Sequence, residues 1–230
     1  MTLLEIDLNK LEHNYSSLRK RLNQHSKMIG VVKANAYGSL SGLIAKKLVD
    51  LGVEALAVAY TQEALELRED GIEIPLIVFY PQVGSFRDII LNNIEPVLYS
   101  KRSWEKFKEV LSEEKKMPYP IHIKYNTGLN RIGFHPREAG WVMEQLDDSS
   151  FNVKSVYSHL AQTDAPKPNE KTEHQISLFE QIMDKHSQAS SQKPEFHLLN
   201  TSGVFNYPKY HLDWVRIGIG LYGFANHPEW

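Results

Sequence analysis

Short apolar runs, rich in β-branched side chains, recur along the whole chain. Most of them are continuous and do not alternate with polar residues, which is typical of parallel strands covered by helices. We therefore predict eight strands, at residues 28–34, 54–60, 75–80, 94–100, 119–125, 152–159, 194–200 and 213–220.

Amphipathic stretches lie between these runs. Apolar residues recur at helical spacing within 104–111, 139–146 and 176–183. A further helix precedes the first strand, because the leucines and the tyrosine of residues 8–22 form one stripe, with Asp7 as a plausible N-cap.

Eight strands that alternate with helices in one domain predict an α/β fold, a (β/α)8 TIM barrel preceded by an N-terminal helix. A doubly wound open sheet is the alternative. That fold commonly has a GxGxxG turn after its first strand, and no such motif follows residues 28–34. We expect residues 1–230 to form a single barrel domain.

Composition narrows the function classes. The 230 residues carry a net charge of −2, which suggests no nucleic-acid partner, and the lack of cysteine excludes disulfides and thiolate metal sites. We predict no metal site. No apolar run reaches transmembrane length, and Glu5 and Asp7 stand where a signal peptide would be basic and then apolar. We therefore expect a cytoplasmic protein without a membrane partner.

Polar residues stand at the carboxyl ends of the predicted strands, where barrels place their catalytic groups. They are Lys33 after the first strand, Lys124 and Arg131 at the fifth, His159 after the sixth, Asn200, Thr201 and Ser202 after the seventh, and Arg216, Gly218 and Ile219 at the eighth.

Lys33 has two interpretations. It is either a loop lysine that reaches water or a lysine whose amine the fold delivers to a pocket. The segments 200–203 and 218–220 are either ordinary turns or donors of N–H and hydroxyl groups where barrels commonly bind phosphate. A lysine and a phosphate site on one face together predict pyridoxal 5'-phosphate (PLP) as cofactor.

Arg216 is either the partner in a salt bridge or a donor to the pyridine nitrogen of PLP. Because arginine stays charged, it would keep that nitrogen unprotonated and make the ring a weaker electron sink. Such a cofactor favours the return of a proton to Cα. His159 is either a structural residue or the support of Arg216.

Five segments in order resemble the N-terminal barrel of alanine racemase, from about Glu5 to Gly223. They are EIDLNKLEHNY, VVKANAYG, KYNTGLNRIGF, HLLNTSG and VRIGIGLYG.

The resemblance implies a role for each candidate. Lys33 would bond PLP and serve as the base on one face of the substrate Cα, and Arg131 would orient the substrate. Lys124 matches a lysine that is carbamylated in many members and that positions this arginine. The remaining cofactor contacts would be Tyr37, Thr201, Gly218 and Ile219 at the phosphate, Asn200 and Ser202 beside it, Arg216 at the pyridine nitrogen, and His159 behind Arg216.

Two departures from the family pattern stand out. Asn126 replaces the usual aspartate, which predicts a looser loop or an altered setting of Lys124. Ser39 and Leu40 replace the usual His-Gly pair, a variation that resembles racemase halves fused to a cell-wall ligase.

Alanine racemases continue into a C-terminal β-domain that supplies the opposite-face tyrosine and the dimer contacts. The sequence past the barrel, ANHPEW, carries no counterpart, so we expect a truncated chain or an isolated barrel, with little activity of its own.

The resemblance implies interconversion of L-alanine and D-alanine for peptidoglycan synthesis, by a protein that is a homodimer at full length. Two alternatives remain. One is another fold-type III PLP enzyme, such as a decarboxylase or a broad-specificity racemase. The other is a single-barrel PLP-binding protein that takes part in cofactor homeostasis without turnover.

Overall fold

The computed structural model describes residues 3–146, 149–165, 167, 169–189 and 192–224. Eight parallel strands occur, close to the predicted runs. They are β1 (Lys27–Val31), β2 (Ala55–Val58), β3 (Leu76–Val78), β4 (Glu95–Leu98), β5 (Tyr119–Lys124), β6 (Phe151–Tyr157), β7 (Glu195–His197) and β8 (Trp214–Ile217).

The strands form a closed barrel in chain order, so the open-sheet alternative is wrong. Closure is made by β1 and β8, where Met28 pairs with Val215 and Gly30 with Ile217. Strands in the order β1 to β8 need a helical crossover at each step, which the alternating pattern of the sequence supplies.

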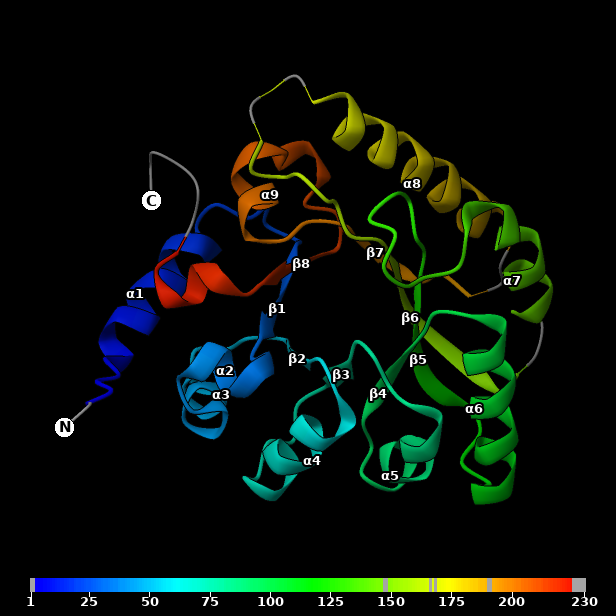
Figure 1. Cartoon of the computed structure of the whole chain (residues 1–230), viewed down its shortest axis with the longest axis horizontal. Coiled ribbons are helices and arrows are strands. Elements are labelled where there is room, and N and C mark those ends of the chain that lie inside the picture. The colour runs from blue at the N-terminus through cyan, green and yellow to red at the C-terminus, as the bar shows by residue number, and fades with distance from the viewer. Residues whose placement is uncertain (1–2, 147–148, 166, 168, 190–191, 225–230) are drawn as a thin grey trace.

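Helices surround the strands (Figure 1). They are α1 (Leu8–Arg19), α3 (Ser41–Asp50), α4 (Thr61–Glu69), α5 (Phe86–Leu91), α6 (Lys101–Glu114), α7 (Ala139–Gln145), α8 (Glu170–Ala189) and α9 (Thr201–Asn206), with a short turn, α2 (Lys33–Gly38), after β1. Short 3-10 turns are η1 (Val83–Ser85), η2 (Pro136–Glu138), η3 (Pro208–Tyr210) and η4 (Ile219–Tyr222).

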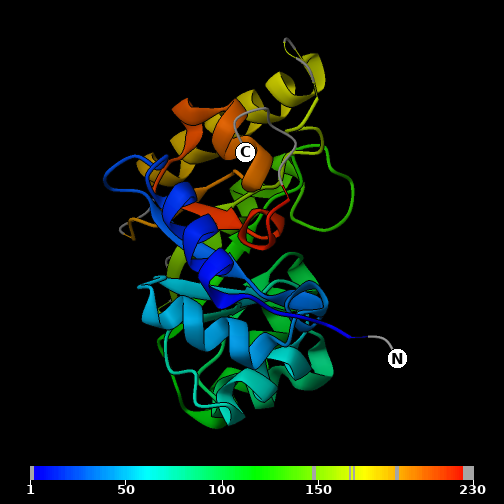
Figure 2. The ribbon, with the colours of Figure 1, turned by 90° about the vertical axis from the view of Figure 1, so that its left-hand side faces the viewer.

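The N-terminal helix forms as predicted. The Asp7 carboxylate accepts hydrogen bonds from the backbone N–H groups of Asn9 and Lys10 and so caps α1. Leu11, Tyr15 and Leu18 are its buried stripe. Figure 2, which turns α1 toward the viewer, shows it at the side of the barrel, where it contacts α3 and η4.

The expectation that the first strand reaches Lys33 is wrong. β1 ends at Val31, and the backbone then enters a left-handed turn in α2. Ala34, Asn35, Ala36 and Tyr37 all have φ between 51° and 54°. Each non-glycine residue in this region costs roughly 1–2 kcal/mol, so surrounding contacts must hold the turn.

Candidate functional site

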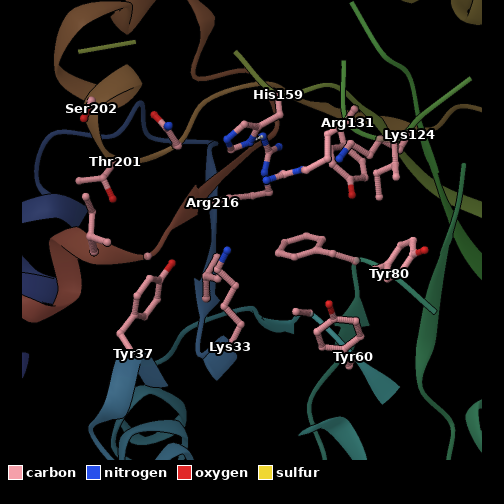
Figure 3. A pocket seen from close by; sticks show the side chains of 18 residues that line it. Lys33, Tyr37, Tyr60, Tyr80, Lys124, Arg131, His159, Thr201, Ser202 and Arg216 are labelled. Atoms are coloured by element: carbon pink, nitrogen blue, oxygen red, sulfur yellow. Dashed lines mark hydrogen bonds between the residues drawn. The ribbon is translucent and has the colours of Figure 1, made fainter. Parts of the chain in front are cut away.

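One cavity of about 610 Å³ opens at the carboxyl ends of the strands (Figure 3). Every residue that the sequence nominated lines it. Tyr37, Thr201 and Ser202 lie on one side of the view and Arg131 and Lys124 on the other, with Arg216 and Lys33 between them. The fold therefore brings residues from both ends of the chain to one place, as the strand-end argument predicts.

The left-handed turn aims Lys33 at this cavity. The Glu63 carboxylate ties the turn to the start of α4, since it accepts hydrogen bonds from the N–H of Ala34 in the turn and from those of Ala59 and Tyr60 before the helix. Asn35 adds a bond from the N–H of Ser41 to its side-chain oxygen, 2.8 Å long. Lys33 is half-buried, with its Nζ 6.0 Å from the centre of the Tyr37 ring. It is thus a pocket lysine, not a loop lysine in open water.

Arg216 is 4% exposed and has no carboxylate in contact with it among the described residues. Its Nη2 donates to the carbonyl oxygens of Ser158 and Leu198, at 2.8 and 2.9 Å. His159 Nδ1 lies 3.2 Å from Nη2, and His197 Nδ1 lies 2.5 Å from Nη1. The salt-bridge interpretation of Arg216 therefore fails, and His159 does contact the guanidinium.

Cationic groups dominate the pocket. Among the described residues that line it, Lys33, Lys124, Arg131 and Arg216 carry basic side chains and none carries a carboxylate. Burial and the charges of Arg131, Arg216 and Lys33 lower the pKa of Lys124 from 10.5 to about 7. Burial and the neighbouring cations likewise hold the pKa of His159 well below its ordinary value. The positive charge of such a cavity favours an anionic ligand.

The side of the pocket near α9 offers hydroxyl groups and tight backbone turns. The Thr201 hydroxyl accepts from the N–H of Gly220 at 3.2 Å and keeps its own proton to donate. The Tyr37 hydroxyl packs so closely on Gly218 that a Cβ there would lie 2.3 Å from it. Asn200 has a structural role. Its Oδ1 accepts a hydrogen bond from the N–H of Gly203, which caps α9, and another from the Thr163 hydroxyl.

Arg131 stands in a loop that Asn126 organises. The Asn126 Oδ1 accepts from the N–H groups of Gly128 and Asn130, at 3.2 and 2.9 Å. Its Nδ2 also donates to the Asn130 side-chain oxygen at 3.3 Å, a bond that an aspartate could not make. The amide therefore holds the loop by itself, which does not support the expectation of a looser loop.

Sequence reasoning missed several residues of this site. His197 stands inside a strand motif, and only its contact with Arg216 reveals it. Tyr157 is fully buried, stacks on His197 at 4.5 Å and has a hydroxyl with no hydrogen-bond partner among the described residues. Tyr60 and Tyr80 form an aromatic pair on the rim, 5.9 Å apart. The sequence did offer a signal for these two residues, since each tyrosine ends a predicted strand run, 54–60 or 75–80.

The fold and site define a barrel protein with a cationic, lysine-bearing pocket at its carboxyl face. Residues 6–226 match the family model described as "Alanine racemase, N-terminal domain". The chain belongs to this family.

Curated proteins similar to this chain are named alanine racemases. Alanine racemase 2 of Oceanobacillus iheyensis is 33% identical over 99% of this chain, and alanine racemase of Treponema denticola is 34% identical over 97%. The chain covers 57% and 60% of the length of these two proteins.

Among solved structures, alanine racemase of Clostridium difficile 630 superposes with a TM-score of 0.92 at 30% identity, over 97% of this chain and 59% of that one. The enzyme from D-cycloserine-producing Streptomyces lavendulae gives 0.91 at 26% identity, over 97% and 59%. A further Clostridium difficile structure is a complex with cycloserine, with a TM-score of 0.92 at 30% identity, over 97% and 62%.

No helix in the described ranges is long and apolar enough to cross a bilayer. Within the same ranges, no group of three or more His, Cys, Asp or Glu residues is arranged to hold a metal ion.

Proposed function

We propose that residues 1–230 are the PLP-binding barrel of an alanine racemase, which interconverts L-alanine and D-alanine in the cytoplasm for peptidoglycan synthesis. One observation carries the proposal. A pocket with four basic side chains and, among its described residues, no carboxylate suits a ligand that brings several negative charges. PLP brings a phosphate, and the amino-acid substrate brings a carboxylate.

The residues present fit this cofactor. The Lys33 amine would bond it covalently, and Arg216 would donate to the ring nitrogen with His159 in support. The phosphate would meet hydroxyl and N–H donors beside the close approach of Tyr37 to Gly218. These donors belong to Tyr37, Thr201, Gly218 and Ile219, with Asn200 and Ser202 at the border. When bound, PLP makes the substrate Cα proton acidic by drawing electrons from it.

The chain's own groups would then handle the substrate. The Lys33 amine accepts and returns the Cα proton on one face. Arg131 orients the substrate. Above pH 7 the Lys124 amine is mostly neutral and can attack CO2, so that an N–C bond forms, one proton leaves, and the resulting carbamate pairs with Arg131. Because Lys33 reaches one face only, we expect the 230 residues alone to racemise poorly, and the assembled enzyme to be a homodimer.

The test is to add PLP to the purified chain, reduce with borohydride and map the adduct by mass spectrometry. We expect the adduct on Lys33, its loss in Lys33→Ala, and its retention in the control Lys46→Ala. A folded chain with no adduct, or with adducts spread over surface lysines, contradicts the proposal.

An assay with L-alanine extends the test. Trace racemisation by the 230 residues supports the one-face expectation, and robust turnover contradicts it. Release of CO2 from an amino acid would favour a decarboxylase, the other fold-type III interpretation. Tight PLP capture without turnover in any longer form of the protein would favour the homeostasis interpretation.

A further inference from the structure

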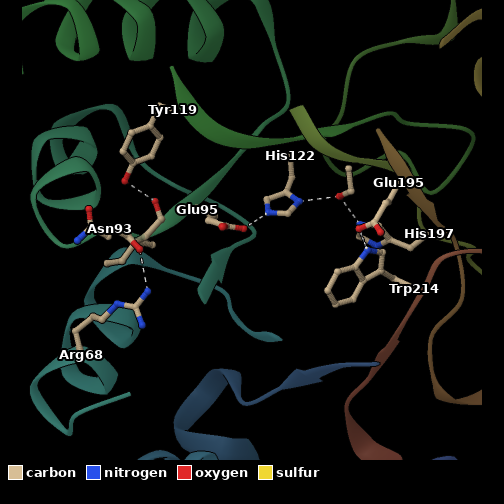
Figure 4. A network of polar contacts seen from close by, with 10 residues as sticks. Arg68, Asn93, Glu95, Tyr119, His122, Glu195, His197 and Trp214 are labelled. Carbon is tan, nitrogen blue, oxygen red and sulfur yellow. Dashed lines mark hydrogen bonds and ion pairs between the residues drawn. The ribbon is translucent and has the colours of Figure 1, made fainter. Parts of the chain in front are cut away.

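A chain of polar side chains crosses the barrel interior, and Figure 4 shows its part from Glu95 through His122 to His197. Arg216 Nη1 lies 2.5 Å from His197 Nδ1, and His197 Nε2 lies 2.7 Å from the Ser155 hydroxyl. That hydroxyl lies 2.7 Å from His122 Nδ1, and His122 Nε2 lies 2.9 Å from Glu95 Oε2. We call these five residues the relay.

The relay joins the two ends of the barrel. Its members stand on successive strands, from β8 back to β4. Arg216 borders the functional pocket, whereas Glu95 is the first residue of β4 and borders a second cavity, of about 420 Å³. The three middle members, His197, Ser155 and His122, are at most 5% exposed.

The chemistry of the two ends fixes the direction of every hydrogen bond. A guanidinium only donates, so His197 Nδ1 must offer a lone pair, and the ring proton sits on Nε2 and goes to Ser155. The Ser155 hydroxyl then donates to His122 Nδ1. His122 Nε2–H donates to the Glu95 carboxylate, which only accepts. All four contacts are satisfied by two neutral histidines, a cation at the pocket and an anion at the far end.

An extra proton would break this order. On His197 it would set an N–H against the guanidinium. On His122 it would direct a second N–H at the Ser155 hydroxyl, whose own hydrogen would lose its acceptor. Burial and the charge of Arg216 hold the pKa of His197 well below its usual value. At Glu95, burial raises the pKa, whereas the hydrogen bond from His122 and the nearby Lys154 and Arg68 cations act downward, and the net pKa is lowered.

We propose that Ser155, His122 and Glu95 are positioning residues for Arg216. They keep His197 as the neutral Nε2–H tautomer, whose Nδ1 lone pair holds the guanidinium at the pocket. The proposal rests on the proposed function to the extent that Arg216 meets the cofactor ring. Without Ser155, the Nε2–H of His197 would be a buried donor with no acceptor, and the ring could leave Arg216.

The first test needs no cofactor. Long-range proton–nitrogen NMR spectra of the chain at pH 7 report the tautomer of each histidine, with His122→Gln and His197→Gln used for assignment. We expect both rings to be neutral and protonated at Nε2. A ring protonated at Nδ1, or at both nitrogens, overturns the proposal.

The second test compares Ser155→Ala with Ser26→Ala. Ser26 is a matched control, because it is 2% exposed and its hydroxyl donates to the Leu212 carbonyl oxygen outside the relay. In Ser155→Ala we expect the His197 Nδ1 shift to move and the apparent dissociation constant for PLP to rise about three- to tenfold, the effect of one buried hydrogen bond. Ser26→Ala should change neither.

Failure of the proposed function and failure of the relay proposal would give different results. If the wild-type chain captures no PLP at Lys33, the proposed function fails, while the NMR spectra still test the relay. If the wild-type chain captures PLP and Ser155→Ala matches Ser26→Ala in both readouts, the relay proposal is wrong. If Ser155→Ala does not fold, Glu95→Gln replaces it. Its amide oxygen can still accept from His122 but lacks the charge, so a rise of about two- to threefold is expected, and an unchanged constant overturns the proposal.

Discussion

The two halves of the barrel interior differ in chemistry. The strands β1 to β4 contribute an apolar cluster, whereas β5 to β8 contribute polar and charged groups that are just as buried. The apolar set is Ile29, Val31, Ala55, Ala57, Ile77 and Val97; the polar set is His122, Lys124, Ser155, His197 and Arg216. The first half fixes the shape of the barrel, and the second places charge beneath the pocket.

Tyr157 marks the border between the halves. It belongs to the apolar cluster, yet its ring stacks on His197 and lies 4.9 Å from the Arg216 guanidinium carbon. An aromatic face attracts cations without the charge of a carboxylate. The polar half therefore stays rich in positive charge at its pocket end, at a cost in stability that the apolar half does not carry.

The largest effect on stability is expected when Lys124, in the polar half, is replaced by an apolar residue. The pKa of this lysine is lowered from 10.5 to about 7, so below pH 7 the folded chain holds a buried ammonium at a cost of about 5 kcal/mol. Between pH 7 and 10.5 the unfolded chain binds a proton that the folded chain does not, and stability rises with pH. Lys124→Met should therefore stabilise the chain most below pH 7 and least near pH 10.5.

Urea unfolding over this pH range, in buffer free of CO2, measures the effect. The control is Lys154→Met, an exposed lysine of β6, which should leave the pH dependence as it is. A Lys124→Met chain that keeps the wild-type slope would contradict the charge asymmetry between the halves.

The next effect lies in the apolar half. Ile77 is 2% exposed, and Ile77→Ala should lower the free energy of unfolding by about 3 kcal/mol through lost burial and the cavity left behind. The loss should be equal at pH 6 and pH 9, since Glu95, which pairs with Ile77 across β3 and β4, has a lowered pKa and stays charged at both pH values. Ile77→Val should cost about 1 kcal/mol. A loss that varies with pH would show that the halves are electrostatically coupled.

The sequence predicted most of this architecture because strands and strand ends have a strong local signature. The eight apolar runs gave the barrel, and the rule that barrels place function at carboxyl strand ends identified residues as distant as Lys33 and Arg216, which the structure brings to one cavity. The N-cap at Asp7 followed from local chemistry in the same way.

The relay could not be predicted in this way. His122, Ser155 and His197 stand inside strand motifs, and a single polar residue in such a run indicates nothing about its neighbours. Their proximity depends on strand register, in which His122 pairs with Ser155 and Tyr157 with His197. The left-handed turn after β1 was missed because three of its four residues, Ala34, Ala36 and Tyr37, rarely adopt that conformation, although Asn35 tolerates it. A long-range hydrogen bond from the Ala34 N–H to Glu63 helps to hold the turn.

A smaller effect should follow from Gly218→Ala, at the rim of the polar half. The new Cβ would lie 2.3 Å from the Tyr37 hydroxyl and would push that side chain out of place. We expect the apparent dissociation constant for PLP to rise about tenfold, the loss of roughly one charge-assisted hydrogen bond. The control Gly84→Ala has open space around the new Cβ and should bind PLP like the wild-type chain. An equal change in both variants would contradict a local role for the Tyr37 contact.

The smallest effect is expected in the loop that follows β1 in the apolar half, at Leu40. The φ of 66° and ψ of 91° of this leucine are unfavourable for any side chain with a Cβ. Relief of that strain, set against the higher chain entropy of glycine, should make Leu40→Gly more stable by about 1 kcal/mol. Leu43→Gly is a matched control, because Leu43 is also exposed but lies within α3, where glycine should destabilise by about 1 kcal/mol. Thermal unfolding of both variants should therefore give shifts of opposite sign, and a destabilised Leu40→Gly chain would mean that contacts of the leucine side chain outweigh the strain of its backbone.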